Sequence, residues 1–159
     1  MPLRVRGINV IEIINKYFSD LGINFSFGNL QQSNQASFNV DNAGLSAFTA
    51  GNTITYNITR TNRGSHMNAA NGQFTAPTTG VYHFSFTGIT ETGEPVTQIE
   101  LRKNGSNTGI RGYSVVNGYQ NISINASISL VKGDIISIFV VEGKIHGNYG
   151  SSFSGFFVA

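Results

Sequence analysis

The side chains that could carry out acid–base or metal chemistry are few and far apart in this sequence. The three histidines, His66, His83 and His146, form no HExxH pattern or other spacing typical of metal ligands. The chain has no cysteine, which excludes a thiol nucleophile and a CxxC metal site. It also has no G-x-S-x-G or phosphate-binding glycine motif. The sequence therefore argues against an enzyme, although a Ser–His–Asp triad assembled only in space stays open.

Two polar segments rich in tyrosine are the candidates for a binding surface instead. They read GIRGYSVVNGYQ from residue 109 and KIHGNYGSS from residue 144. A tyrosine ring can stack on a sugar face while polar neighbours exchange hydrogen bonds with its hydroxyls. The candidate ligand-binding residues are Arg111, Tyr113, Tyr119, His146, Asn148 and Tyr149. The alternative is that these tyrosines cap the ends of the fold or line a subunit interface.

The acidic and basic residues predict neither a metal centre nor a nucleic-acid partner. Calcium needs several oxygen ligands, but the closest pair of the eight acids is Glu91 and Glu94, so no metal ligand is assigned. The net charge is only +2, and the basic residues form no stripe that would track a nucleic acid.

Signals for export and for the membrane are also weak. No apolar run of about 18 residues suggests a membrane span, and the N-terminus shows no signal peptide. Five N-x-S/T sequons support secretion only weakly, because the chain is rich in Asn, Ser and Thr.

The elements that must position these candidates are β-strands from residue 36 onward. Short apolar or alternating runs are separated by Asn71-Gly72, Asn104-Gly105 and Asn117-Gly118, which favour tight hairpin turns. The run GVYHFSFTGI from residue 80 alternates, with Tyr82, Phe84 and Phe86 on one face. This pattern predicts an all-β sandwich or jelly roll.

Two of the expected strands are apolar on both faces. Residues 134–141, DIISIFVV, and the terminal FSGFFVA each place large apolar side chains on opposite sides of a strand. An antiparallel strand with one wet face should not do so. We therefore expect one face to fill the core and the other to contact another subunit; coverage by loops of the same chain is the alternative.

Residues 1–35 differ from the rest in pattern and form a separate N-terminal segment. The apolar residues Ile11, Ile14, Phe18, Leu21 and Phe25 recur with spacings of three and four over about two heptads. This favours a short trimerising stalk, or else an amphipathic helix or strand laid against the main domain. The polar run from Asn29 to Gln35 is typical of a linker.

The stretch RGSHM, Arg63 to Met67, looks like the remnant of a cleaved affinity tag in the middle of the chain. Its surroundings argue that it is native. Residues 56–84 follow the spacing F-x5-[ND]-x4-[FYWL]-x6-F-x5-G-x-Y-x-F, which continues in frame across RGSHM with Met67 at the large apolar position. We therefore predict that Met67 is buried.

This spacing resembles the aromatic signature of the C1q-domain family. The segments LRKNG, LVKGDIISIFV and FSGFFVA resemble the family in the same order, so the resemblance covers residues 36–159. Tyr56 stands where the family usually has Phe, and Met67 stands where it usually has an aromatic residue or Leu. The chain also lacks the Gly-x-y repeat of collagen-like stalks. The family-signature residues are Tyr56, Asn62, Met67, Phe74, Gly80, Tyr82, Phe84, Phe153, Gly155 and Phe156.

The resemblance implies a ten-strand jelly roll similar to the tumour necrosis factor fold, assembled as a homotrimer. Members of the family are non-enzymatic recognition modules, mostly secreted or on surfaces, and some hold calcium near the trimer axis. Our first hypothesis is therefore a trimeric module that binds glycan or protein ligands on surfaces. The second is a structural tip or assembly domain of a fibre, appendage or spore coat, and a receptor-activating cytokine is a third.

Overall fold

The computed structural model of the chain describes residues 4–5, 8–22, 35–148 and 150–159. The chain divides into two compact units, Met1–Asn34 and Gln35–Ala159, and each is treated by itself below. The second unit carries the ligand-binding candidates and the signature residues.

Among its described residues the N-terminal unit contains one helix, which confirms the predicted helical segment; whether it serves as a trimerising stalk stays a prediction. Strands β1 (Arg4–Val5) and β2 (Ile8–Asn9) pair antiparallel, and helix α1 (Val10–Asp20) follows directly. The helix ends at Asp20, and Gly22 caps the turn that follows: its φ of 71° suits a left-handed cap and its N–H donates to the Ser19 carbonyl at 3.0 Å. Phe25, the last residue of the predicted apolar seam, lies outside the described residues.

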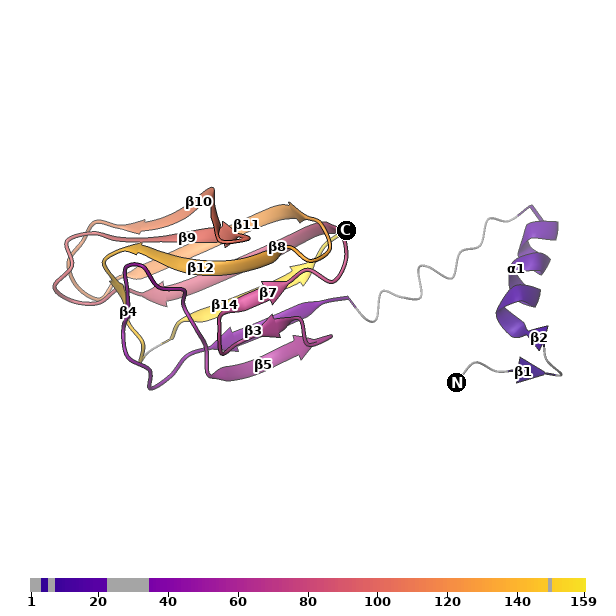
Figure 1. Cartoon of the computed structure of the whole chain (residues 1–159), viewed down its shortest axis with the longest axis horizontal. Helices are drawn as coiled ribbons and strands as arrows, with labels where there is room; N and C mark the ends of the chain where they lie inside the picture. The colour runs from indigo at the N-terminus through magenta and orange to yellow at the C-terminus, as the bar shows by residue number, and fades with distance from the viewer. Residues whose placement is uncertain (1–3, 6–7, 23–34, 149) are drawn as a thin grey trace. The chain divides into compact units, whose positions relative to one another are not determined.

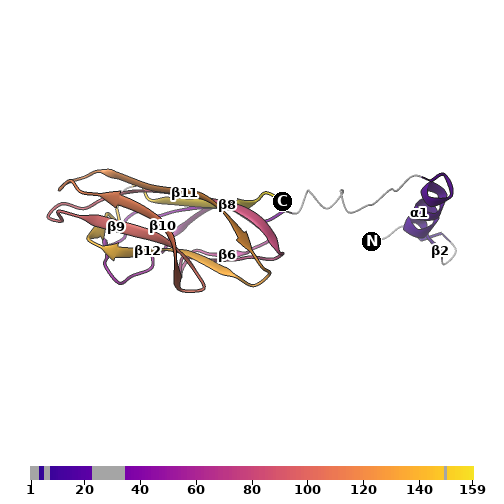
Figure 2. The ribbon, with the colours of Figure 1, turned by 90° about the horizontal axis from the view of Figure 1, so that it is seen from above.

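The second unit is a sandwich of two five-strand antiparallel sheets, which confirms the predicted ten-strand all-β fold (Figure 1). The first sheet runs in the order β10 (Ser106–Ser114), β9 (Thr97–Lys103), β12 (Ile135–Glu142), β7 (Gln73–Thr75) and β6 (Met67–Asn68). The second sheet runs in the order β11 (Asn121–Leu130), β8 (Gly80–Ile89), β14 (Ser152–Phe157), β3 (Ser37–Asp41) and β5 (Ile58–Arg63). A small pair, β4 (Phe48–Thr49) with β13 (Lys144–Ile145), completes the described strands. Figure 2 shows the two layers from above, with β8 and β11 in one layer and β9 and β12 in the other.

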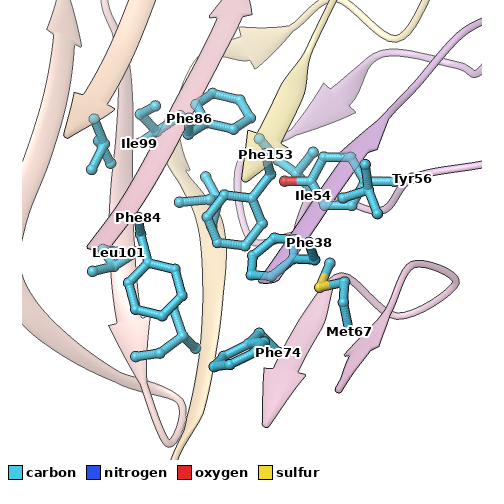
Figure 3. Packing of buried hydrophobic residues seen from close by; sticks show 14 of the residues in the cluster. Phe38, Ile54, Tyr56, Met67, Phe74, Phe84, Phe86, Ile99, Leu101 and Phe153 are labelled. Atoms are coloured by element: carbon cyan, nitrogen blue, oxygen red, sulfur yellow. The ribbon is translucent and has the colours of Figure 1, made fainter. Parts of the chain in front are cut away.

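Alternation along the strands fills the space between the sheets with aromatic rings (Figure 3). Tyr82, Phe84 and Phe86 of β8 are fully buried, as the sequence predicted. The ring of Phe38 from β3 lies 5.2 Å from that of Phe74 and 5.0 Å from that of Phe153. Burial of each such side chain contributes about 1.5–3 kcal/mol to the free energy of folding. Because the rings come from strands of both sheets, this core holds the two sheets together.

The stretch RGSHM consists of the last residue of β5, the turn of residues 64–66 and the first residue of β6. Gly64 and Ser65 have positive φ, and the Asn62 side chain spans the turn by accepting from the Met67 N–H at 3.1 Å and donating to its carbonyl at 2.7 Å. Met67 is only 4% exposed, so its predicted burial is confirmed. A side-chain amide that closes both ends of a turn makes this stretch an integral part of the fold.

The two doubly apolar strands have different environments. In β12 the core face consists of Ile136, Ile138 and Val140, all fully buried. On the opposite face of β12 the Phe139 ring is covered within the chain, because the Arg102 guanidinium lies 3.2 Å from its centroid. In β14, by contrast, Phe156 is half exposed on the outward face, and Val158 just beyond the strand is equally exposed. Arg102 therefore covers part of the outward face of β12, where Val141 is still 36% exposed, while the C-terminal segment keeps an open apolar surface.

Candidate ligand-binding surfaces

The fold separates the candidate binding residues into two groups. Arg111 and Tyr113 lie in β10 of the first sheet, whereas Tyr119, His146 and Asn148 lie in loops. Tyr149 lies outside the described residues.

The first group of contacts joins the loop after β8 to the loops before β11 and β14. We call Glu91, Tyr119, His146 and Asn148 the loop-end cluster. The rings of Tyr119 and His146 are 5.3 Å apart, and Tyr119 is 58% exposed. The Asn148 N–H donates to His146 Nδ1 at 3.0 Å, while its side-chain carbonyl accepts from the Gly44 N–H at 3.0 Å. His146 Nε2 lies 3.8 Å from a Glu91 carboxylate oxygen. The cluster thus presents an exposed ring beside polar groups whose positions are fixed.

Thr90 anchors the loop that carries Tyr119. Its buried hydroxyl donates to the Gly118 carbonyl at 2.5 Å and accepts from the Gln120 N–H at 3.0 Å. The Asn117 side chain also accepts from the Gly93 N–H at 2.8 Å. These bonds hold both sides of Tyr119, so the ring is presented from a constrained backbone.

A second cluster lies on the outward face of the first sheet. Alternation in β9 turns Ile99 and Leu101 into the core, and it turns Gln98, Glu100 and Arg102 outward. In the register of the sheet, Glu100 lies between Arg111 of β10 and Phe139 of β12. We call Gln98, Glu100, Arg102, Arg111, Tyr113 and Phe139 the outer-face cluster.

Glu100 is the centre of this cluster and is only 2% exposed, although it points away from the core. The Arg102 Nε donates to one carboxylate oxygen at 2.7 Å, and the Arg111 Nε lies 3.8 Å from the other. The Arg102 guanidinium carbon also lies over the Phe139 ring, 3.2 Å from its centroid. A desolvated carboxylate needs such partners, and the two arginines and the ring shield it from water.

Gln98 connects Arg111 to Tyr113. With its amide oriented as the neighbouring donors and acceptors require, Gln98 donates to the Tyr113 hydroxyl at 2.9 Å and accepts from Arg111 Nη1 at 3.2 Å. Gln98 is buried, whereas Tyr113 is 55% exposed. Arg111 and Tyr113 were named from the sequence, but Gln98, Glu100, Arg102 and Phe139 were missed. The polar–apolar alternation of TQIELRK was the available signal for the three residues of β9.

The acids nearest the loop ends do not fit a calcium site. Glu94 pairs with Lys144 at 2.7 Å, which raises the pKa of the lysine, and Glu91 faces His146. Within the described ranges, no group of three or more His, Cys, Asp or Glu side chains is arranged to hold a metal ion. The same ranges contain no helix long and apolar enough to span a bilayer.

The remaining signature residues mostly build the core. Tyr56, Phe74 and Phe153 are buried, and the Tyr82 hydroxyl donates to the Thr78 carbonyl at 2.8 Å. A Cβ on Gly155 would lie 2.6 Å from the Phe84 ring, and one on Gly80 would lie 2.4 Å from the Ala159 carbonyl, so both positions need glycine. Phe156 differs from the others, because it is exposed on the outward face beside His83, with ring centroids 5.4 Å apart.

The C1q domain family matches residues 37–158. Complement C1q tumor necrosis factor-related protein 3 from Homo sapiens, like the same protein from Mus musculus, is 33% identical over 107 residues. That alignment covers 65% of this chain and 43% of the relative, so the chain matches less than half the length of these proteins.

Solved structures share the fold at lower identity. The globular domain of zebrafish complement 1qA protein superposes with a TM-score of 0.65 at 19% identity, covering 78% of this chain and 98% of that one. Murine APRIL gives 0.62 at 11% identity, covering 78% and 99%. The Eiger TNF of S. frugiperda gives 0.61 at 11%, covering 79% and 93%. Together with the family match and the signature residues in the core, these likenesses show that the chain belongs to the C1q domain family, a non-catalytic family with the tumour necrosis factor-like fold.

Proposed function

We propose that this chain is a homotrimeric recognition module that binds glycan or protein ligands on surfaces through its loops. The observation that carries the proposal is the loop-end cluster, which holds an exposed Tyr119 ring against His146 with Asn148 fixed beside them. An aromatic face next to fixed polar groups suits a sugar ring or a polar protein surface. Such a site binds a ligand without catalysing a reaction, as expected of a non-catalytic family.

The outward face of the second sheet supports assembly into a trimer. Phe156 and Val158 are each 50% exposed there, and Phe156 contacts His83 of β8. C1q and tumour necrosis factor-like domains typically form homotrimers, so a second and third copy are the occupants we propose for this face. Three weak sites on one rigid trimer would raise avidity without strong single contacts.

We further infer that the module works outside the cell or on the surface of a cell or particle. The C1q and tumour necrosis factor-related homologues are secreted proteins, which supports this location. A trimer that displays several copies of one site is most useful where the ligand is itself repeated on a surface.

A glycan array probed with the intact protein tests the proposed site. Tyr119→Ala should reduce binding to any glycan recovered by about tenfold, because the sugar loses the aromatic face on which it stacks. Val116→Ala, an exposed change in the same loop, is the matched control and should leave binding unchanged. Equal glycan binding by Tyr119→Ala and Val116→Ala would show that the loop-end cluster is not the binding site.

A structural tip or assembly domain is the second candidate, and α1 favours it. Ile13, Tyr17 and Leu21, spaced by four residues, are each more than half exposed along one side of the helix. In isolation an 11-residue helix is marginal in water, so this stripe needs a partner such as a second copy. Deletion of residues 1–34 decides between the candidates: loss of the trimer together with no ligand on the array favours the structural role.

A further inference from the structure

The outer-face cluster carries an inference that rests on the proposed recognition function and goes beyond its loops. Glu100 points outward yet is 2% exposed, and two guanidinium groups approach this one carboxylate. One positive charge therefore remains uncompensated within the cluster. The exposed acid Glu142 pairs with Gln98 in the sheet register. Gln98 precedes Arg102 by four residues in β9, so Glu142 lies roughly 13 Å along the strand from Arg102, at about 3.3 Å per residue.

The Arg102 side chain is held by two contacts that leave N–H donors of its guanidinium for a ligand. Its Nε donates to Glu100 at 2.7 Å and its guanidinium carbon lies 3.2 Å from the Phe139 ring centroid, but the side chain is still 27% exposed. A guanidinium has five N–H donors in a fixed fork, and its terminal edge suits a planar anion. Because the intramolecular contacts already fix the side chain, little side-chain entropy would be lost when a ligand binds to that edge.

Arg111 and Tyr113 extend the same surface along β10. Arg111 is 38% exposed at its side chain and shares the buried Gln98 amide with the Tyr113 hydroxyl. The Tyr113 ring is 55% exposed, so an apolar face stands beside two charged donors. A ligand that matches both features carries an anionic group and a ring with apolar C–H edges.

The geometry points to the outer-face cluster as a binding site for acidic saccharides, in which the guanidinium edges of Arg102 and Arg111 bind a sugar carboxylate and Tyr113 stacks on a sugar ring. A uronic acid polymer has this chemistry on every residue. An acidic polypeptide supplies the carboxylate but no ring for Tyr113, which is why the saccharide is favoured. Phe139 and Glu100 act as positioning residues, since they hold Arg102 and do not themselves reach the ligand.

Titration of the intact protein with an oligogalacturonate, followed by calorimetry, tests the site. We expect binding that weakens as salt is added, and at least about tenfold weaker binding to the methyl-esterified oligomer, because a charge-assisted hydrogen bond is lost. Arg111→Gln and Tyr113→Ala should each weaken binding by about tenfold. Arg60→Gln is the matched control, because Arg60 pairs with Asp41 across β5 and β3 of the other sheet.

Each outcome of these titrations either supports the acidic-saccharide site or contradicts it. Arg111→Gln leaves the close Arg102–Glu100 pair intact, so its fold should hold, and an unchanged melting temperature checks this. If Arg60→Gln weakens binding as much as Arg111→Gln does, or the methyl ester binds equally well, the inference is wrong. Poly-glutamate that binds as tightly as the oligogalacturonate, with the same dependence on Arg111, would replace the saccharide by an acidic polypeptide.

Failure of this inference and failure of the proposed function give different results. If glycans on the array are bound in a manner that depends on Tyr119 but the oligogalacturonate is not bound, the recognition function stands and the outer-face site does not. If neither the array nor the oligogalacturonate shows binding by the trimer, both proposals are wrong.

Discussion

At the scale of single residues, two tyrosines show how burial and hydrogen bonding have separate effects. Tyr56 and Tyr82 are both buried in the core, but only Tyr82 donates its hydroxyl, to the Thr78 carbonyl at 2.8 Å. The Tyr56 hydroxyl has no hydrogen-bond partner among the described residues, and burial raises its pKa well above the ordinary value of 10.0. Tyr56 also stands where the family signature usually has Phe.

The pair therefore predicts opposite effects of the same substitution. Tyr56→Phe should leave the free energy of unfolding unchanged or raise it by about 1 kcal/mol, since a buried unpaired hydroxyl is removed. Tyr82→Phe should lower it by about 1 kcal/mol, because the Thr78 carbonyl loses its donor. Urea denaturation measures both. A loss for Tyr56→Phe as large as that for Tyr82→Phe would show that the Tyr56 hydroxyl is hydrogen-bonded.

Gly155 gives a second prediction at this scale. A Cβ there would lie 2.6 Å from Phe84 and 2.7 Å from Phe38, so Gly155→Ala forces rings of the core apart. Overpacking of this kind costs about 1–3 kcal/mol, measurable by the same denaturation. Ser154→Ala, on the neighbouring outward position of β14, should change stability by less than about 0.5 kcal/mol. Equal effects of the two changes would contradict the tight approach of β14 to the core.

At the scale of elements, Asp134 fastens one hairpin turn to another. It lies between β11 and β12, and it contacts Lys103 at 2.7 Å, the Asn104 amide at 2.8 Å and the Val131 N–H at 2.8 Å. The bond from Lys103, followed by those from Asn104 and Val131, lowers the pKa of Asp134 from 3.8 to about 2. The family-like segments LRKNG and LVKGD are thus joined by one carboxylate.

The lowered pKa of Asp134 predicts the pH range in which its contribution to stability is lost. A carboxyl with a folded pKa below its unfolded value stabilises the fold above the unfolded value of 3.8, and the contribution disappears as pH falls through about 2. The difference in free energy of unfolding between the parent and Asp134→Asn should therefore be constant near about pH 6 and shrink toward about pH 2. Urea denaturation at several pH values measures it. A difference that does not depend on pH would mean that the charge of Asp134 is irrelevant.

The strands show which structure could be predicted from the sequence and which could not. The faces of β8 were predicted correctly because alternation depends only on the local extended backbone. Burial of Met67 followed from a spacing that ran in frame across RGSHM. The outer-face cluster could not be found in this way, since it requires β9 to lie between β10 and β12. Arg102 and Phe139 are distant in sequence, so their contact over β12 could not be predicted; a subunit contact on the rest of that face stays a prediction.

At the scale of the whole molecule, the proposed function depends on copies of the chain coming together. One copy exposes Phe156 and Val158 on the second sheet, the loop-end cluster in its loops and the outer-face cluster on the first sheet. The proposed assembly uses the first of these and leaves the two binding surfaces accessible. Multivalent recognition requires that assembly, because each single site is small.

The mass of the intact protein in solution, measured by sedimentation at micromolar concentration, tests the account most directly. We predict a species of three times the 17.1 kDa chain, and we predict that Phe156→Asp shifts it to the monomer while the melting of the β-sandwich is retained. Val115→Asp, which places the same charge at an exposed apolar residue of the loop before β11, is the control and should leave the trimer intact. A parent protein that sediments as a monomer would contradict the trimeric recognition module.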